Sequence, residues 1–100
     1  MPNELLVNID VPDLGAGISF YETGLGFTLR RLLFDETVAE LCFSGVRVHL
    51  IRQKSGSSAI PDTTIRRAYD DHWTPVHLDI VVDDLAAAIA QACDRHCDAL

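Results

Sequence analysis

The feature that most constrains the fold is an internal repeat, because the start of the chain reappears 71 residues later. Positions 6–18 align with positions 77–89, and six of these thirteen pairs are identical. The identical pairs are Ile9 and Ile80, Val11 and Val82, Asp13 and Asp84, Leu14 and Leu85, Ala16 and Ala87, and Ile18 and Ile89. Each copy is typical of a strand, a capping aspartate and an amphipathic helix. Such a unit is too small to bury its own apolar face, so we expect two modules packed side by side.

The first copy continues into a complete β-α-β-β-β module. Alternation of β-branched and polar residues predicts a strand over 5–11, and apolar residues at helical spacing predict a helix over 14–25. Strands are predicted over 27–34, 37–43 and 46–52. The gaps between these last strands, Asp35-Glu36 and Ser44-Gly45, are two residues long, which is hairpin spacing.

The second copy is shorter. A polar connection over 53–75 includes Ser55-Gly56-Ser57-Ser58, which we interpret as a flexible linker, and a strand over 76–82 and a helix over 85–95 follow. The domain organisation is thus a first module at 1–52, the connection at 53–75 and the start of a second module at 76–100. Either the sequence is a fragment of a longer protein, which we favour, or another chain completes the domain.

Composition narrows the classes of partner. Apolar residues make up 48% of the chain, enough for a packed core, and the formal net charge is −7. This charge disfavours nucleic acid and anionic membranes, and no apolar run reaches the roughly 20 residues of a membrane helix. The odd set of cysteines, Cys42, Cys93 and Cys97, and the lack of a secretory signal favour a reducing, cytoplasmic location.

Three segments together resemble a known superfamily. These are Val7 to Leu14, the run Phe20-Tyr21 followed by Gly24-Leu25-Gly26-Phe27, and Val76 to Leu85. They look like the glyoxalase/bleomycin-resistance/dioxygenase superfamily, also called the vicinal-oxygen-chelate (VOC) fold. The resemblance implies an α+β fold of paired βαβββ modules, here with the second module incomplete, and together forming one VOC domain.

The same resemblance implies where a metal would bind. In metal-using members, one ligand lies on the first strand of each module and another on its last strand. Carried over by position, His77 fills the second-module slot, and His49 lies at or near the last-strand slot of the first module. Leu6 stands in the first-strand slot and cannot bind a metal, and the remaining slot falls beyond Leu100. The metal implied is a divalent ion such as iron, manganese, zinc or nickel.

The connection holds the candidate substrate-binding residues Arg67, Tyr69 and Trp73. Connections that cross the mouth of a cavity often bind ligands, since arginine can hold a carboxylate and an aromatic ring can stack. The alternative is that these aromatic residues only pack the connection against the sheet. Glu40 and Glu22 have no evident partner in the sequence, so we expect both at the surface.

Two classes of function remain open, besides an inactive fragment. The first is a divalent-metal-dependent enzyme, of lyase or dioxygenase type, acting on a small molecule. The alternative is a metal-free protein resembling the bleomycin-resistance members, which bind cationic aromatic drugs. In both cases we expect a small-molecule ligand and a homodimer, since curved sheets with open edges commonly pair across a two-fold axis.

Overall fold

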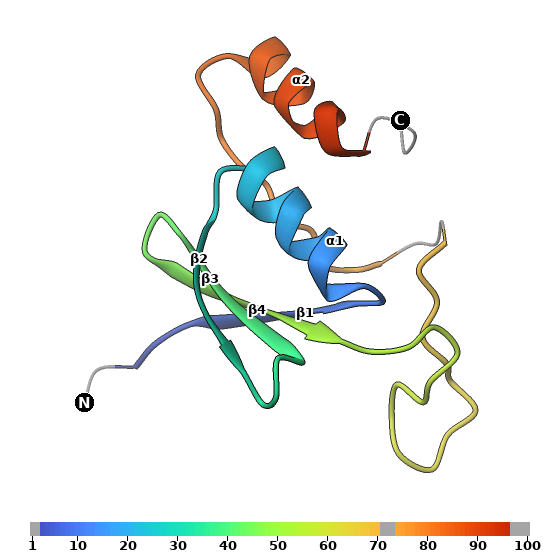
Figure 1. Cartoon of the computed structure of the whole chain (residues 1–100). Helices are drawn as coiled ribbons and strands as arrows, with labels where there is room; N and C mark the ends of the chain where they lie inside the picture. The colour runs from blue at the N-terminus through green and yellow to red at the C-terminus, as the bar shows by residue number, and fades with distance from the viewer. Residues whose placement is uncertain (1–2, 71–73, 97–100) are drawn as a thin grey trace.

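The computed structural model describes residues 3–70 and 74–96, which form a four-stranded mixed sheet with helices on one face (Figure 1). The strands are β1 (Leu6–Val11), β2 (Thr28–Leu33), β3 (Val38–Phe43) and β4 (Val46–Arg52), in the order β1-β4-β3-β2. β1 runs parallel to β4, whereas β3 is antiparallel to both of its neighbours. This arrangement confirms the α+β class and the first βαβββ module.

The core lies between the sheet and the helices because the strands alternate inward and outward side chains. The most buried cluster is formed by Val11, Phe27, Ala39, Leu41, Val48 and Leu50. Leu41 and Leu50, at the centres of β3 and β4, are fully buried. Phe27 stacks on Phe43 with ring centroids 4.6 Å apart, and thus closes the end of the core next to the helices.

Both repeat copies begin their helices in the same way. In α1 (Leu14–Ser19), the amide of Ala16 donates to Asp13 Oδ1 at 3.0 Å. In α2 (Leu85–His96), the amide of Ala87 donates to Asp84 Oδ1 at the same distance. These equivalent caps satisfy one free amide of each first turn. They give the aligned aspartates of the repeat the same structural role.

The first helix changes character halfway along. The α-helical turns of α1 continue as a π-helix, η1 (Phe20–Gly24), where a single α-helix was predicted over 14–25. The wider turn accompanies close packing of Phe20, Tyr21 and Phe27, whose successive ring centroids are each 5.3 Å apart, edge to face. α2 packs against η1, and Gln91 Nε2 donates to the carbonyl of Thr23 at 2.9 Å.

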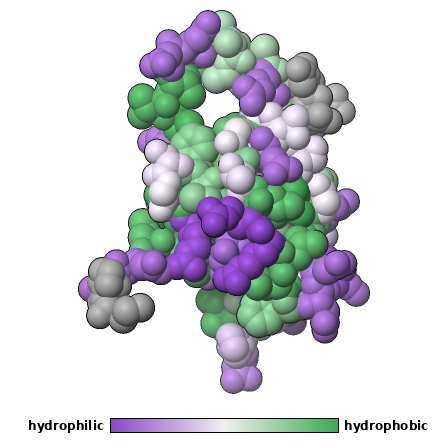
Figure 2. Space-filling view, turned by 60° about the vertical axis from the view of Figure 1, so that its left-hand side comes forward, coloured by the Kyte–Doolittle hydropathy of each residue, from purple (hydrophilic) through white to green (hydrophobic). Residues whose placement is uncertain are grey.

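The strand predicted over 76–82 is not formed: this part of the described chain is extended but has no ladder partner. A strand needs a neighbour for its backbone groups, and the outer edge of β1 stays separate from this segment. Ile80 packs against the core, whereas Val81 is 96% exposed. Figure 2 shows one face of the molecule, where such surface hydrophobic side chains lie beside a compact hydrophilic patch. The homodimer that would cover such surfaces stays a prediction.

The connection is more ordered than its composition suggests. The Ser55-Gly56-Ser57-Ser58 run was interpreted as a flexible linker, but Gly56 N donates to the carbonyl of Arg67 at 2.7 Å and Arg67 N donates to that of Ser57 at 2.8 Å. Arg67 Nε also donates to Asp10 Oδ2 on β1 at 2.8 Å. One arginine therefore closes the loop and ties it to the sheet. None of the described helices has the length and apolar character needed to cross a membrane.

The turn between β2 and β3 also differs from the prediction. It takes four residues, 34–37, rather than two, and Phe34, Asp35 and Glu36 have φ values of +52°, +55° and +63°. The Asp-Glu pair lacks the glycine or asparagine that a tight hairpin turn prefers, so the chain needs a longer turn. Thr37 closes it by donating from its hydroxyl to the carbonyl of Phe34 at 2.7 Å.

This turn predicts that Glu36→Gly stabilises the protein. A left-handed conformation costs a residue with a Cβ roughly 1–2 kcal/mol, partly offset by the greater unfolded-state freedom of glycine. We expect the free energy of unfolding, measured in urea, to rise by about 1 kcal/mol. Thr28→Gly, at an exposed position of β2, is the control and should lower it by about 0.5–1 kcal/mol. A Glu36→Gly protein no more stable than the natural chain would contradict the prediction.

Candidate functional site

The face of the sheet opposite α1 carries a row of polar side chains. Because Val7, Ile9 and Val11 pack into the core, Asn8 on β1 points to the other side, which we call the open face. The strand register then aligns one residue from each strand. Arg31, Glu40, His49 and Asn8 are directly opposite one another across β2, β3, β4 and β1. Neighbouring side chains in such a row are close enough to bond.

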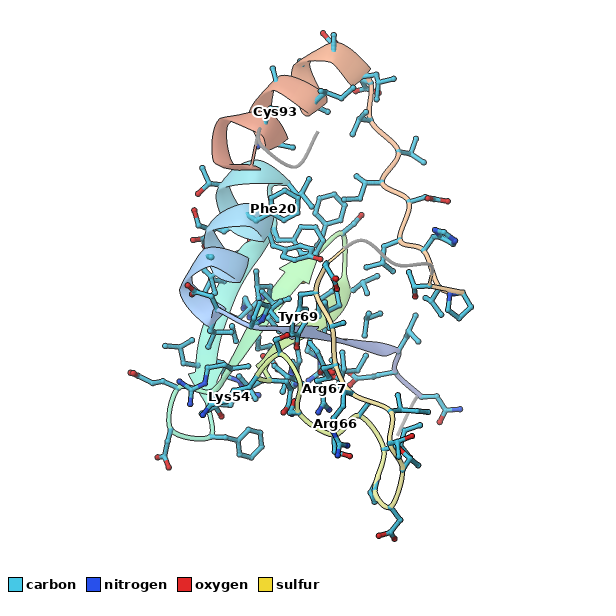
Figure 3. The ribbon with its side chains drawn as sticks, turned by 90° about the vertical axis from the view of Figure 1, so that its right-hand side faces the viewer. Phe20, Lys54, Arg66, Arg67, Tyr69 and Cys93 are labelled. Atoms are coloured by element: carbon cyan, nitrogen blue, oxygen red, sulfur yellow. The ribbon has the colours of Figure 1, made fainter. Side chains whose placement is uncertain are left out.

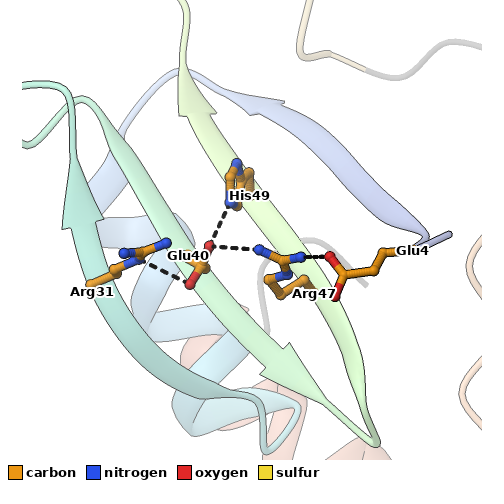
Figure 4. Close-up of polar contacts among 5 residues, drawn as sticks. All are labelled: Glu4, Arg31, Glu40, Arg47 and His49. Atoms are coloured by element: carbon orange, nitrogen blue, oxygen red, sulfur yellow. Dashed lines mark hydrogen bonds and ion pairs between the residues drawn. The ribbon is translucent and has the colours of Figure 1, made fainter. Parts of the chain in front are cut away.

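Glu40 is the centre of this row (Figure 4). Its Oε2 accepts from Arg31 Nε at 3.1 Å, and its Oε1 lies 2.9 Å from His49 Nε2. Arg47, two residues before His49 on β4, brings Nη1 to 3.7 Å from the same Oε1. The other end of the Arg47 guanidinium pairs with Glu4, just before β1. We call these five residues, Glu4, Arg31, Glu40, Arg47 and His49, the polar network.

Glu40 is the buried charged residue of the described chain, with 7% of its surface exposed. The expectation that it lies free at the surface is therefore wrong. It is covered by the side chains of its own cationic partners rather than by the apolar core, because it faces away from Leu41 and Ala39. A charge removed from water needs such partners, so the network explains why an acid is tolerated in mid-sheet.

The partners also set the charge state of Glu40. The hydrogen bond from His49 is the largest influence and lowers the pKa of the carboxyl below its ordinary value. Burial acts in the opposite direction, and the hydrogen bond and charge of Arg31 lower the pKa further. Glu40 is therefore an anion at neutral pH and accepts every hydrogen bond made to it.

The two predicted metal ligands are in different surroundings. His49 is half-buried in the polar network, whereas His77 is exposed on the extended segment after the connection. Leu6 faces Arg47 in the register, and Asn8 rather than Leu6 is opposite His49. Across residues 3–70 and 74–96, no three His, Cys, Asp or Glu side chains come together in a group that could hold a metal ion.

The candidate substrate-binding residues lie near the free edge of β1 (Figure 3). Arg67 and Tyr69 both line a hollow of about 560 Å³ beside Asp10, and Tyr69 also lines a cavity of about 570 Å³. That second cavity continues under α1 to Phe20 and Tyr21. The guanidinium of Arg67 donates hydrogen bonds to Asp10 and to Ser57 of the connection. The hydroxyl of Tyr69 donates to the carbonyl of Gln53 at 2.8 Å. Trp73 lies outside the described residues.

Sequence reasoning identified His49 but missed its partners Arg31, Glu40 and Arg47. The signal was partial. On β4, Arg47 and His49 alternate with apolar residues, and on β3 Glu40 is the charged residue of an otherwise apolar strand. On β2, Arg30 and Arg31 are adjacent, so the sequence does not show which of them shares the face of His49. Only the register, including the irregularity between Leu29 and Arg31, shows which of them meet.

The lowered pKa of Glu40 predicts a loss of stability in acid. The unfolded carboxyl, with a pKa of about 4.3, takes up a proton at a higher pH than the folded carboxyl does. The stabilisation from Glu40 is therefore complete above about pH 4.3, and it disappears as the pH falls through the lower pKa of the folded state. We expect Glu40→Gln to make stability less dependent on pH in this window. Urea unfolding at several pH values gives the free energy of unfolding as a function of pH. The same slope of that free energy against pH for the natural chain and for Glu40→Gln would contradict the prediction.

Comparison with known proteins identifies the family. Residues 6–95 match the sequence model of the glyoxalase-like domain family, and this match spans both repeat copies and the connection. Searches of curated proteins and of solved structures gave no match. The βαβββ module observed agrees with the match, as do the equivalent helix starts. The chain therefore belongs to the glyoxalase-like domain family, within the VOC superfamily.

Proposed function

We propose that this glyoxalase-like chain binds a small organic molecule on the open face of its sheet, through oxygen atoms of the ligand. The observation that carries the proposal is the polar network around Glu40, in which hydrogen-bond donors gather on the face away from the helices. A small number of precisely placed polar groups fixes the orientation of a small ligand and gives specificity. Four of the five network residues stand on strands, so the sheet itself fixes most of those groups.

Two arginines supply the donors for such a ligand. Arg31 uses Nε for Glu40, and no described residue makes a hydrogen bond to its η nitrogens. Arg47 is held on one side by Glu4, whose side chain is 67% exposed and stands at the beginning of the sheet. A ligand carboxylate can replace that of Glu4 and pair with the guanidinium in a bidentate manner. The preferred ligand therefore carries a carboxylate or two neighbouring oxygens.

Oxalate is a suitable probe because it presents neighbouring oxygens and nothing else. We expect oxalate to shift the backbone amide resonances of β3 and β4 in an NMR titration. The double variant Arg31→Ala, Arg47→Ala should weaken binding by about tenfold or more, since a hydrogen bond to a charged group contributes about 1.5–3 kcal/mol. Arg52→Ala, on the opposite side of β4, also removes a guanidinium group and should bind oxalate as the natural chain does. Equal affinities for all three proteins would contradict the proposal.

The divalent-metal enzyme is the second candidate, and the adjacency of His49 and Glu40 favours it. An imidazole and a carboxylate 2.9 Å apart are two donors of the kinds that bind iron, manganese or zinc. A catalytic metal normally requires at least three protein ligands. The described residues supply two, and Glu40 is already held by Arg31 and Arg47, so this donor set does not fit a metal by itself. His77 or a residue from elsewhere would have to complete it.

Metal analysis separates the two candidates. The chain would be purified without chelator, assayed for bound metal and titrated calorimetrically with Mn²⁺ and Zn²⁺. The metal-enzyme candidate predicts stoichiometric binding that disappears in His49→Ala, because this removes a required ligand; loss in His77→Ala as well would identify His77 as the ligand that completes the site. Absence of binding at any concentration contradicts that candidate and leaves metal-free ligand binding.

The drug-binding form of the metal-free proposal has a separate observation in its favour. The cavity of about 570 Å³ is within the range of small-molecule pockets and is lined by the rings of Phe20, Tyr21 and Tyr69. Asp13 lines the same cavity, and its carboxylate and these rings suit a ligand with a positive charge. The surface charge of the chain, −7 overall, acts in the same direction.

A further inference from the structure

The two ring nitrogens of His49 have different surroundings. Nε2 faces Glu40 Oε1 at 2.9 Å. Because an ionised carboxylate can only accept, Nε2 must carry the hydrogen of this bond. Neutral His49 is therefore held in the tautomer whose lone pair is on Nδ1. A carboxylate that fixes a histidine in this way is a recurring part of general-base sites.

Nδ1 is available to solvent. No described residue bonds to it, and every buried polar side-chain atom of the described residues has a hydrogen-bond partner. An unpartnered nitrogen in this half-buried ring is consequently not buried. Figure 4 shows the ring with one nitrogen toward Glu40 and the other directed away from it. A water molecule on the open face can therefore donate a hydrogen bond to Nδ1.

We propose that His49, positioned by Glu40, is a general base that activates water for the hydrolysis of small carboxylic esters on the open face. The Nδ1 lone pair takes a proton from water as the water oxygen attacks the ester carbonyl, and the carbonyl π electrons move to its oxygen. Collapse of this tetrahedral intermediate breaks the bond to the alkoxy group. The imidazolium returns the proton to that leaving oxygen, so that water and ester give acid and alcohol, with no other reactant.

A neighbour of His49 can hold the negative charge that develops. Asn8 is directly across from His49 in the β1–β4 register and is exposed on the open face. Its amide is a donor within reach of a group bound at Nδ1. Donors aimed at a developing oxyanion are a major source of rate acceleration.

The inference uses the site of the proposed function and rests on it, but it is tested by a different measurement. The probe is p-nitrophenyl acetate, with release of p-nitrophenolate followed by absorbance and compared with free imidazole at the same concentration. We expect turnover that is slower in D₂O, because a proton moves in the rate-limiting step. His49→Ala should lower kcat/KM by about a hundredfold or more. The control His96→Ala, which removes another imidazole of the chain, should leave it unchanged.

Glu40→Gln tests the positioning role, with NMR spectra checking that the variant folds. It should lower kcat more than it changes KM, and the ¹⁵N shifts of His49 should show that the single Nδ1-lone-pair tautomer is lost. Glu40→Asp, which keeps the negative charge, should recover part of the kcat and part of the preference for the Nδ1-lone-pair tautomer. A rate equal to that of free imidazole would overturn the inference, and so would an acetyl group found on His49, since it would then act as a nucleophile.

Oxalate binding and ester hydrolysis can fail independently of each other. If oxalate binds as expected but ester hydrolysis does not depend on His49, the general-base role of His49 is contradicted and ligand binding on the open face is supported. If hydrolysis depends on His49 while oxalate does not bind, the general-base role of His49 is supported and oxygen binding by Arg31 and Arg47 is contradicted.

Discussion

The parallel pairing of β1 with β4 is the interaction on which the rest of the structure depends. It joins the first strand of the chain to the last strand of the meander and thereby makes a single sheet of four strands. Parallel neighbours require a crossover, and α1 with η1 provides it on one face. That arrangement places the strand residues that pack into the core on the helix side and leaves the polar row through Glu40 on the open face. The same strand register thus sets the core on one face of the sheet and the polar network on the other.

The polar network shows how a sheet can carry charge at its centre. The carboxylates of Glu40 and Glu4 face the two guanidinium groups of Arg31 and Arg47, so the local charge is close to balanced. Removing a cationic partner leaves the buried carboxylate of Glu40 less well paired, which generally costs more than the complete set contributes. The network therefore behaves as a unit, and a ligand that enters it must replace the contacts that it disturbs.

Much of the fold was predictable because it depends on local patterns. Alternating strands and capping aspartates are recorded in short stretches of sequence, and β4 was predicted with the bounds that it has. The four-residue turn was not predictable in detail, since it results from the absence of a turn-forming pair rather than from a positive signal. The segment 76–82 has strand composition but no partner, and composition does not report partners. For the site, His49 was found through the resemblance, whereas Glu40 needed the register.

The distance along the chain between β1 and β4 has a consequence for how the protein folds. Leu6 meets Arg47 across the parallel pair, so β1 has no partner until some forty residues have followed it. The hairpins β2–β3 and β3–β4 close over short loops, and their loop-closure entropy is small. Contacts of high sequence separation form late because that entropy must be overcome first. The meander is thus the template onto which the N-terminal strand docks, and the open face with its bound charges is assembled from the middle of the chain outward.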